Sequence, residues 1–169
     1  MPLSMFALTV RPLERALGNL SHILDKGLAD AQARGFDPAI LVQARLRPDM
    51  IPLSGQVQRA SDSSKALVAR LAGLDIPSFA DDETTFEQLQ DRIARTLAFV
   101  RSVGPEQLEG SEDKAISFKA GPHALSFSGL GYLTDFALPN IHFHVTTAYA
   151  ILRHNGAPLG KLDYLGPLA

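Results

Sequence analysis

Apolar residues near the start of the chain recur at alternating steps of four and three positions. This spacing places them on one stripe of an α-helix, which completes a turn in about 3.6 residues. Gly35 suits the end of such a helix, whereas Pro12 marks either a kink or the true first turn, because proline lacks an amide hydrogen. The pattern predicts a first helix that ends at Gly35. Its stripe consists of Phe6, Val10, Leu13, Leu17, Leu20, Leu24 and Leu28.

Two more helices are predicted in the middle of the chain. One runs from about Pro52, which a first turn tolerates, to about Gly73. The next follows Thr84 and Glu87, which stand at the spacing of a capping box, and it ends before Gly104. The two inward stripes are Leu53, Val57, Ala60, Ser64, Leu67 and Leu71 in the first, and Phe86, Leu89, Ile93, Leu97 and Val100 in the second.

The hydrophobic period changes to two in the stretch "KAISFKAGPHALSFSG". Ile116 and Phe118, and then Leu125 and Phe127, alternate with polar or small residues on either side of Ala-Gly-Pro-His. Alternation of this kind is typical of strands, and the four residues between the two runs suit a turn. A short β-hairpin is therefore expected here.

A helical pattern returns after the hairpin. The fourth helix is predicted from about Gly131 to Asn155, with an interruption or restart at Pro139 and with Gly156 as a left-handed cap. The segment 157–169 is expected to dock on the surface as a tail. Four amphipathic helices and one hairpin predict a single all-α domain over residues 1–169, built as a four-helix bundle.

Composition and charge narrow the classes of partner. The formal net charge is −2 and the Lys and Arg residues are scattered, which argues against a nucleic-acid partner. The chain has no cysteine, so any metal would depend on His, carboxylate or amide oxygen ligands. No run reaches the roughly 18 consecutive apolar residues that are needed to span a membrane. The first residues lack the pattern of a signal peptide, and a cytoplasmic protein is expected.

The stretch "LPNIHFHVTTAYAILRHNG" contains three of the five histidines. In a regular helix His144 shares the inward face with Asn140, whereas His142 lies about 160° away around the axis. These two histidines therefore cannot bind one ion together from a regular helix. Two interpretations of His144 remain: a core histidine bonded to a neighbouring polar group, or one arm of a metal or substrate site.

Other helices offer polar residues that would complete such a pocket. Gln56 lies beside the inward stripe of the second helix, and a buried amide needs a partner, so we expect it to bond His144 or Asn140. Asp49 precedes that helix as an N-cap candidate or a ligand. Glu83 and Glu87, at the start of the third helix, have the same two interpretations. Tyr149 is a further candidate donor to a ligand.

Three segments carry a resemblance to a known family: "RLRPDMIPLSGQVQ", "DDETTFEQLQDRIARTLAFV" and "FALPNIHFHVTTAYAILRHNGAPLGKLDYLG". Together they resemble a bacterial family of unknown function in the DinB/YfiT-like superfamily of metalloenzymes. The resemblance implies an up-down-down-up bundle, a homodimer, and a nickel or zinc site that in some members serves thiol-dependent transfer.

The resemblance also implies where the metal ligands of the superfamily would fall. The second histidine of its H-x-x-x-H motif falls on His144 and the first on Asn140. The ligand of the second helix falls near Gln58 or Arg59. Two of the three expected imidazoles are therefore replaced, which would weaken metal binding severely.

Three functional hypotheses follow. The leading one is a cytoplasmic, dimeric, DinB-like protein that binds a small molecule or serves as a stress-related accessory protein. In this hypothesis a degenerate metal pocket, without a tightly held metal, is formed by His144, Asn140, Gln56, Tyr149 and Asp49. The alternative is a divalent-metal-dependent thiol transferase or hydrolase in which His144 binds nickel or zinc. The third is a dimerisation module whose polar residues fix the helix register.

Overall fold

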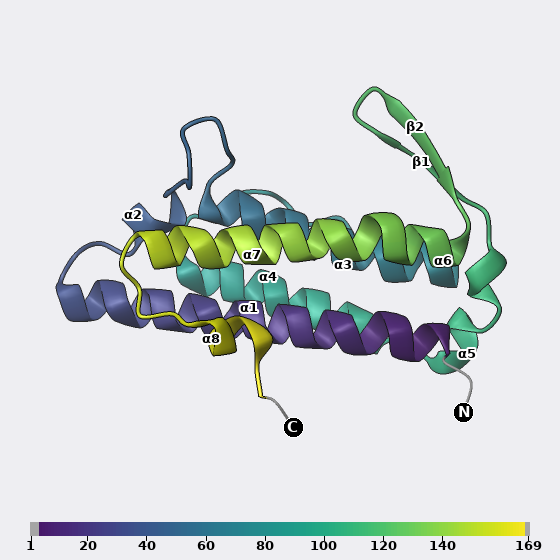
Figure 1. Cartoon of the computed structure of the whole chain (residues 1–169), viewed down its shortest axis with the longest axis horizontal. Coiled ribbons are helices and arrows are strands. Elements are labelled where there is room, and N and C mark those ends of the chain that lie inside the picture. The colour runs from purple at the N-terminus through teal and green to yellow at the C-terminus, as the bar shows by residue number, and fades with distance from the viewer. Residues whose placement is uncertain (1–3, 168–169) are drawn as a thin grey trace.

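The computed structural model describes residues 4–167. Four long helices dominate it, and a small hairpin and several short helices join them (Figure 1). In chain order the elements are α1 (Met5–Arg34), α2 (Ala39–Val42), α3 (Leu53–Ala72), α4 (Phe86–Arg101), α5 (Pro105–Leu108), η1 (Ser111–Asp113), β1 (Ile116–Ala120), β2 (His123–Phe127), α6 (Gly129–Gly131), η2 (Tyr132–Ala137), α7 (Leu138–His154) and α8 (Lys161–Leu165).

The long helices form the predicted four-helix bundle. Helices α3 and α4 both run toward the end of the bundle that carries the hairpin, opposite to α1 and α7 (Figure 1). Helix α3 packs on α7 and α4, and α1 packs on the other side of the same two helices. The up-down-down-up arrangement requires a connection that returns along the bundle, and residues 73–85 supply it between α3 and α4. The predicted fold class is confirmed.

The capping residues explain where α1 begins and ends. The Ser4 hydroxyl accepts a hydrogen bond from the amide of Ala7, and Gly35 adopts the left-handed conformation with φ 73°. Helix α1 runs through Pro12 without a break, so this residue is not the start of the helix. Because Pro12 stands in the third turn, the amide it lacks would have bonded the carbonyl of Leu8.

The start of α4 lies one residue later than the sequence pattern indicated. Thr85 is the N-cap and forms the capping box with Gln88, in place of Thr84 and Glu87. Both pairs have the same spacing, and the Oε1 atom of Gln88 accepts from the amides of Thr84 and Thr85 at 2.7 and 3.1 Å. Because Gln88 stands three positions after Thr85, its side-chain oxygen reaches both of these amides.

The last long helix is preceded by a π-helical segment. The hairpin pairs Ile116 with Phe127, and the chain then stays helical through α6, η2 and α7. Segment η2 is wound as a π-helix, and Pro139 follows in the first turn of α7. Since Pro139 has no amide to donate, the wider winding adapts the helix to the missing bond. The predicted restart at Pro139 corresponds to this change of winding.

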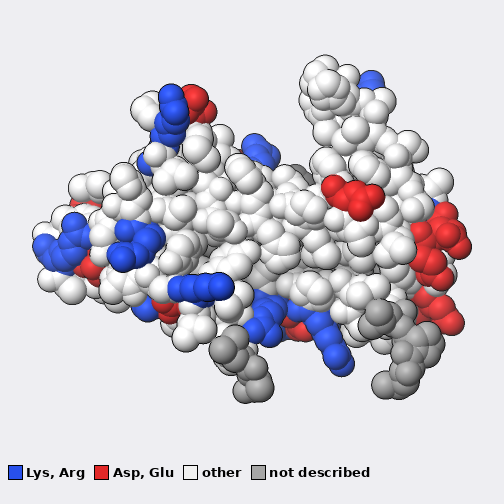
Figure 2. All heavy atoms as spheres, in the orientation of Figure 1, with Lys and Arg blue, Asp and Glu red and all other residues white. Residues whose placement is uncertain are grey.

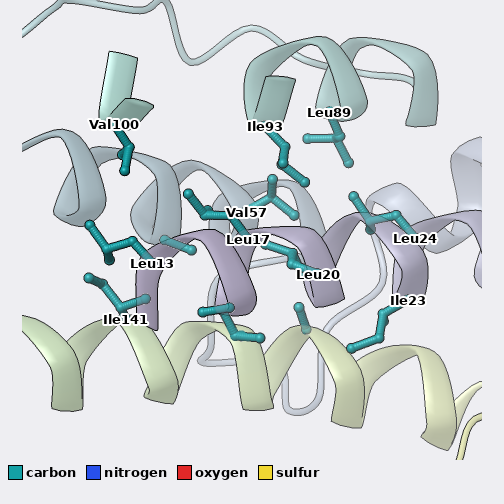
Figure 3. Close-up of a cluster of buried hydrophobic side chains, with 14 of the residues drawn as sticks. Leu13, Leu17, Leu20, Ile23, Leu24, Val57, Leu89, Ile93, Val100 and Ile141 are labelled. Carbon is teal, nitrogen blue, oxygen red and sulfur yellow. The ribbon is translucent and has the colours of Figure 1, made fainter. Parts of the chain in front are cut away.

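The hydrophobic core lies along the bundle axis. Leu13, Leu17 and Leu20 of α1 point toward Val57 of α3 and Ile141 of α7 (Figure 3). All five are fully buried. The side chains of Leu89 and Ile93 close the core from α4 (Figure 3).

The predicted docking of the tail is confirmed for the described residues 157–167, whereas residues 168–169 lie outside the described part of the chain. Helix α8 packs on α1, where the Asp163 carboxylate accepts from His22 at 2.9 Å and from Lys26 at 2.9 Å. The hydrogen bond from the Gly160 amide, followed by those from Lys26 and His22, lowers the pKa of Asp163 to about 2. Of the helices in residues 4–167, none combines the length and apolar character of a membrane span.

Candidate functional site

The candidate site is a polar contact between α3 and α7. The Nδ1 atom of His144 lies 2.8 Å from Oε1 of Gln56, and the Gln56 side chain is almost fully buried. The same amide donates from Nε2 to the carbonyl of Ile51 at 3.2 Å. The predicted partnership of Gln56 with a polar residue of the last helix is present in the structure.

The two bonds of Gln56 fix the hydrogen on the His144 ring. Because the amide nitrogen of Gln56 donates to Ile51, its oxygen faces His144 and accepts. The Nδ1 atom of His144 must then carry the hydrogen, and Nε2 carries the lone pair. A neutral histidine held in this way presents a hydrogen-bond acceptor, a general base or a metal ligand through Nε2.

The surroundings of His144 keep its ring neutral. Burial lowers the pKa of His144, and the positive charge of Arg59 on α3 lowers it further. Both effects disfavour the protonated ring, because it would bring a charge into a partly dry region near a like charge. At neutral pH the Nε2 lone pair is therefore free of a proton.

Asn140 stands one turn before His144 but has a different partner. Its Nδ2 atom donates to the hydroxyl of Ser63 on α3 at 2.7 Å. Among the described residues no donor reaches the Asn140 oxygen or Nε2 of His144. The structure therefore brings His144, Gln56 and Asn140 to one helix interface with two acceptors unused.

The other two predicted pocket residues lie elsewhere. The Asp49 side chain is exposed, 3.5 Å from Arg47, and does not cap α3, whose N-cap is Pro52. The Tyr149 ring packs against Tyr164 of α8 at 6.4 Å between centroids. Tyr149 follows His144 by five residues, which turns it toward α8, and Asp49 precedes α3 by too many residues to reach its first amides.

The residues around His144 do not match the metal ligands of the superfamily. In residues 4–167, no three His, Asp or Glu side chains are grouped so that they could hold an ion. Asn140 and Gln56 bring amides, and the Gln56 oxygen is occupied by the imidazole hydrogen. Nickel and zinc favour imidazole, thiolate and carboxylate ligands, so this set does not fit such an ion.

A buried ionic cluster that the sequence pattern did not predict joins α3, α4 and the loop between them. Arg92 is fully buried and bonds Glu83 at 2.7 Å, Asp62 at 2.8 Å and Asp81 at 3.0 Å. Lys65, also buried, lies 3.0 Å from Asp62. Burial by itself would raise the pKa of Glu83, but the hydrogen bonds from Arg92 and Gln58 lower it overall.

A weak sequence signal for this cluster exists. Arg92 follows Leu89 by three positions and precedes Thr96 by four, so all three share the buried face of α4. Glu83, predicted as a cap or a ligand, instead bonds Arg92 and Gln58. The cluster ties the return loop to the bundle and leaves Glu83 without a vacant oxygen for a metal.

Known structures place this arrangement in a class. The crystal structure of a DinB family member protein from Shewanella denitrificans is 37% identical, over 97% of this chain and 93% of that one, with a TM-score of 0.88. The chain is therefore a DinB-like helix bundle. The profile of the family described as Domain of unknown function (DUF1993) matches residues 5–165, and the chain belongs to this family. No curated protein matches this chain.

Proposed function

We propose that this DinB-like protein binds a small molecule through the acceptor face formed by His144 and Asn140. One observation carries the proposal: Gln56 holds the neutral His144 ring through Nδ1, which leaves the Nε2 lone pair without a partner among the described residues. A ligand for this site must bring a hydrogen-bond donor, such as an amide, an amine or a hydroxyl group. The role of a cytoplasmic accessory protein belongs to the same proposal.

An aromatic side chain beside His144 extends the ligand description. The exposed Phe143 ring meets the imidazole edge to face, with centroids 5.3 Å apart. An aromatic ligand can stack on such a ring while its donor group bonds the imidazole. A flat donor-bearing aromatic molecule is therefore a suitable first probe.

Benzamide and N,N-dimethylbenzamide form a matched pair for the test. Both have the aromatic ring, but only benzamide has amide hydrogens to donate. We expect benzamide, and not the dimethyl compound, to shift the ring resonances of His144 in NMR titrations, and we expect His144→Ala to abolish the binding. Equal shifts with both compounds, or unchanged binding by His144→Ala, would contradict the proposal.

A metal-dependent thiol transferase or hydrolase is the second candidate function. The neutral His144 ring favours it, because nickel and zinc bind imidazole in this form. The poor match of the neighbouring ligands argues against it, and we expect less than stoichiometric metal. The test is to purify the protein without a histidine tag and to measure nickel, zinc and manganese in the parent and in His144→Ala. Stoichiometric metal that is lost in the variant would reverse our preference.

A further inference from the structure

A groove of about 760 Å³ lies where α1, α7 and α8 meet. His142 and Val145 line it from α7, on the side of the helix that faces away from His144. Helix α8 covers the middle of α1, where Asn19 donates to the carbonyl of Tyr164 at 2.7 Å. Because α8 ends there, it leaves the first turns of α1 uncovered, and these turns extend beyond it in Figure 1.

The apolar part of the groove is lined by small side chains. Ala7 and Ala16 contribute only a methyl group each, so they leave space between α1 and α7. The remaining apolar lining comes from Pro12, Val145 and Leu165. A volume of this size is within the range of about 300–1,000 Å³ that is typical of small-molecule sites. The groove can therefore take an apolar body of several carbon atoms.

The polar part of the groove carries an excess of positive charge. Arg11, Arg15 and Arg101 contribute three guanidinium groups, and Glu14 contributes one carboxylate. The chain as a whole has a formal net charge of −2, so this local excess opposes the overall balance. Figure 2 shows basic side chains with an acidic one among them along the lower edge of the molecule, between the two grey termini.

Two of the arginines are held in place and still have unused donors. Arg15 donates from two nitrogens to the carbonyls of Leu165 and Pro167, both at 2.8 Å. Arg101 donates from Nε to Glu14 at 2.7 Å. A guanidinium has five N–H donors, so at least three remain on each of these side chains. On the opposite wall the Tyr164 hydroxyl lies 3.3 Å from Nδ1 of His142.

We propose that this groove is a second binding site, which takes a small amphipathic carboxylate. The carboxylate group pairs with the guanidinium groups, which match its planar geometry, and the hydrocarbon part lies over the alanines and Val145. Nothing in this proposal depends on the His144 site. Three arginines on an acidic chain do not form the extended basic surface that a nucleic acid requires.

Decanoate is a suitable probe, with acetate and decan-1-ol as controls. Acetate has the charge without the hydrocarbon chain, and decan-1-ol has the chain without the charge. We expect decanoate to bind with a stoichiometry of one in titration calorimetry, and we expect the two controls to bind far more weakly. The affinity should fall as salt is added, because the arginines are near the surface.

Substitutions in the groove test its location. We expect Arg11→Gln combined with Arg101→Gln to weaken decanoate binding on the order of tenfold, because two cations are lost and Glu14 loses its partner. Ala7→Phe should weaken binding by filling the groove. Arg47→Gln removes an arginine of the exposed α2–α3 loop, and His144→Ala alters the other site, so both should bind decanoate like the parent.

Several results would overturn the proposal. Equal binding of decanoate and decan-1-ol would exclude a role for charge. Parent-like affinity in the double arginine variant, with the fold verified by circular dichroism, would place the ligand elsewhere. Binding to vesicles of anionic lipid without affinity for dissolved decanoate would make the surface a membrane contact. Failure of His144→Ala to bind decanoate would show that the groove and the His144 site are not independent.

Discussion

At the scale of single residues, the orientation of one amide determines the chemistry of the candidate site. Gln56 donates to a backbone carbonyl of its own segment and accepts from His144 of another helix. A glutamine that is fully buried must satisfy both ends, so it has little freedom to turn. The acceptor character of His144 Nε2 is therefore a consequence of burial at residue 56.

The tautomer of His144 can be measured directly. We predict that nitrogen NMR of the parent shows the hydrogen on Nδ1, and that Gln56→Leu shifts it to Nε2. The variant should also lose about 1–3 kcal/mol of stability, because the Ile51 carbonyl and the imidazole lose a partner. Gln43→Leu, at an exposed position, is the matched control. A hydrogen on Nε2 in the parent would contradict the assignment.

The lowered pKa of His144 predicts how stability depends on pH. Burial and the charge of Arg59 hold this pKa below its ordinary value of 6.5, so on acidification the unfolded chain takes up a proton before the folded one does. The part of the unfolding free energy that His144 contributes is therefore fully present above pH 6.5. It decreases as the pH falls toward the pKa of His144 in the folded state.

The comparison with a variant isolates this contribution. Between about pH 7 and pH 5 the free energy of unfolding should decrease more in the parent than in His144→Gln, as measured by urea denaturation. His123→Gln changes an exposed histidine of the hairpin and should behave like the parent. Identical pH slopes in the parent and His144→Gln would show that the ring is not buried as described.

At the scale of elements, the return loop between α3 and α4 is held by charge as well as by apolar contacts. Arg92 reaches three carboxylates, and its side chain is 1% exposed. Phe79 of the same loop lies beneath the Lys65 ammonium at 3.6 Å. These contacts fix a segment that has no regular secondary structure of its own.

Removal of Arg92 should therefore be costly. We predict that Arg92→Ala loses about 3–5 kcal/mol of unfolding free energy, because Glu83 is left buried without its cation. Arg47→Ala is the control, since Arg47 is exposed and its pair with Asp49 contributes at most about 1 kcal/mol. Chemical denaturation measures both. A loss in Arg92→Ala as small as that of the control would show that the cluster adds little to stability.

At the scale of the whole molecule, two segments project from the same side of the bundle. They are the loop between α2 and α3, and the β1–β2 hairpin (Figure 1). Ile40, Leu46 and Ile51, in and beside the first projection, are 60%, 41% and 39% exposed. Exposed apolar side chains on projecting segments are typical of surfaces that a partner covers.

We predict that a second copy of the chain covers these projections. Light scattering coupled to gel filtration should give twice the chain mass of 18.2 kDa. Replacement of Ile40 and Leu46 by serine should shift the protein toward the monomer, whereas Leu162→Ser, an exposed leucine on α8, should not. A parent that elutes with the mass of one chain would refute the dimer.

The sequence by itself determined the bundle. The stripe from Val10 to Leu24 and the glycines that end α1 and α3 specify helix length and the buried face, because periodicity and left-handed caps act within one segment. The inward position of His144 followed from the same periodicity. These features depend on residues that are close in the chain.

Only the tertiary structure decided which polar groups meet. Gln56 and His144 are 88 positions apart, and Arg92 bonds Asp62 across 30 positions. Asp49 and Tyr149 have suitable side chains but do not reach the site. Asp49 lies in the exposed loop before α3, and Tyr149 faces α8 from another side of α7. The groove beside Arg11 exists because α8 ends where it does on α1. A contact between distant segments depends on how the helices pack, and no local pattern of residues specifies it.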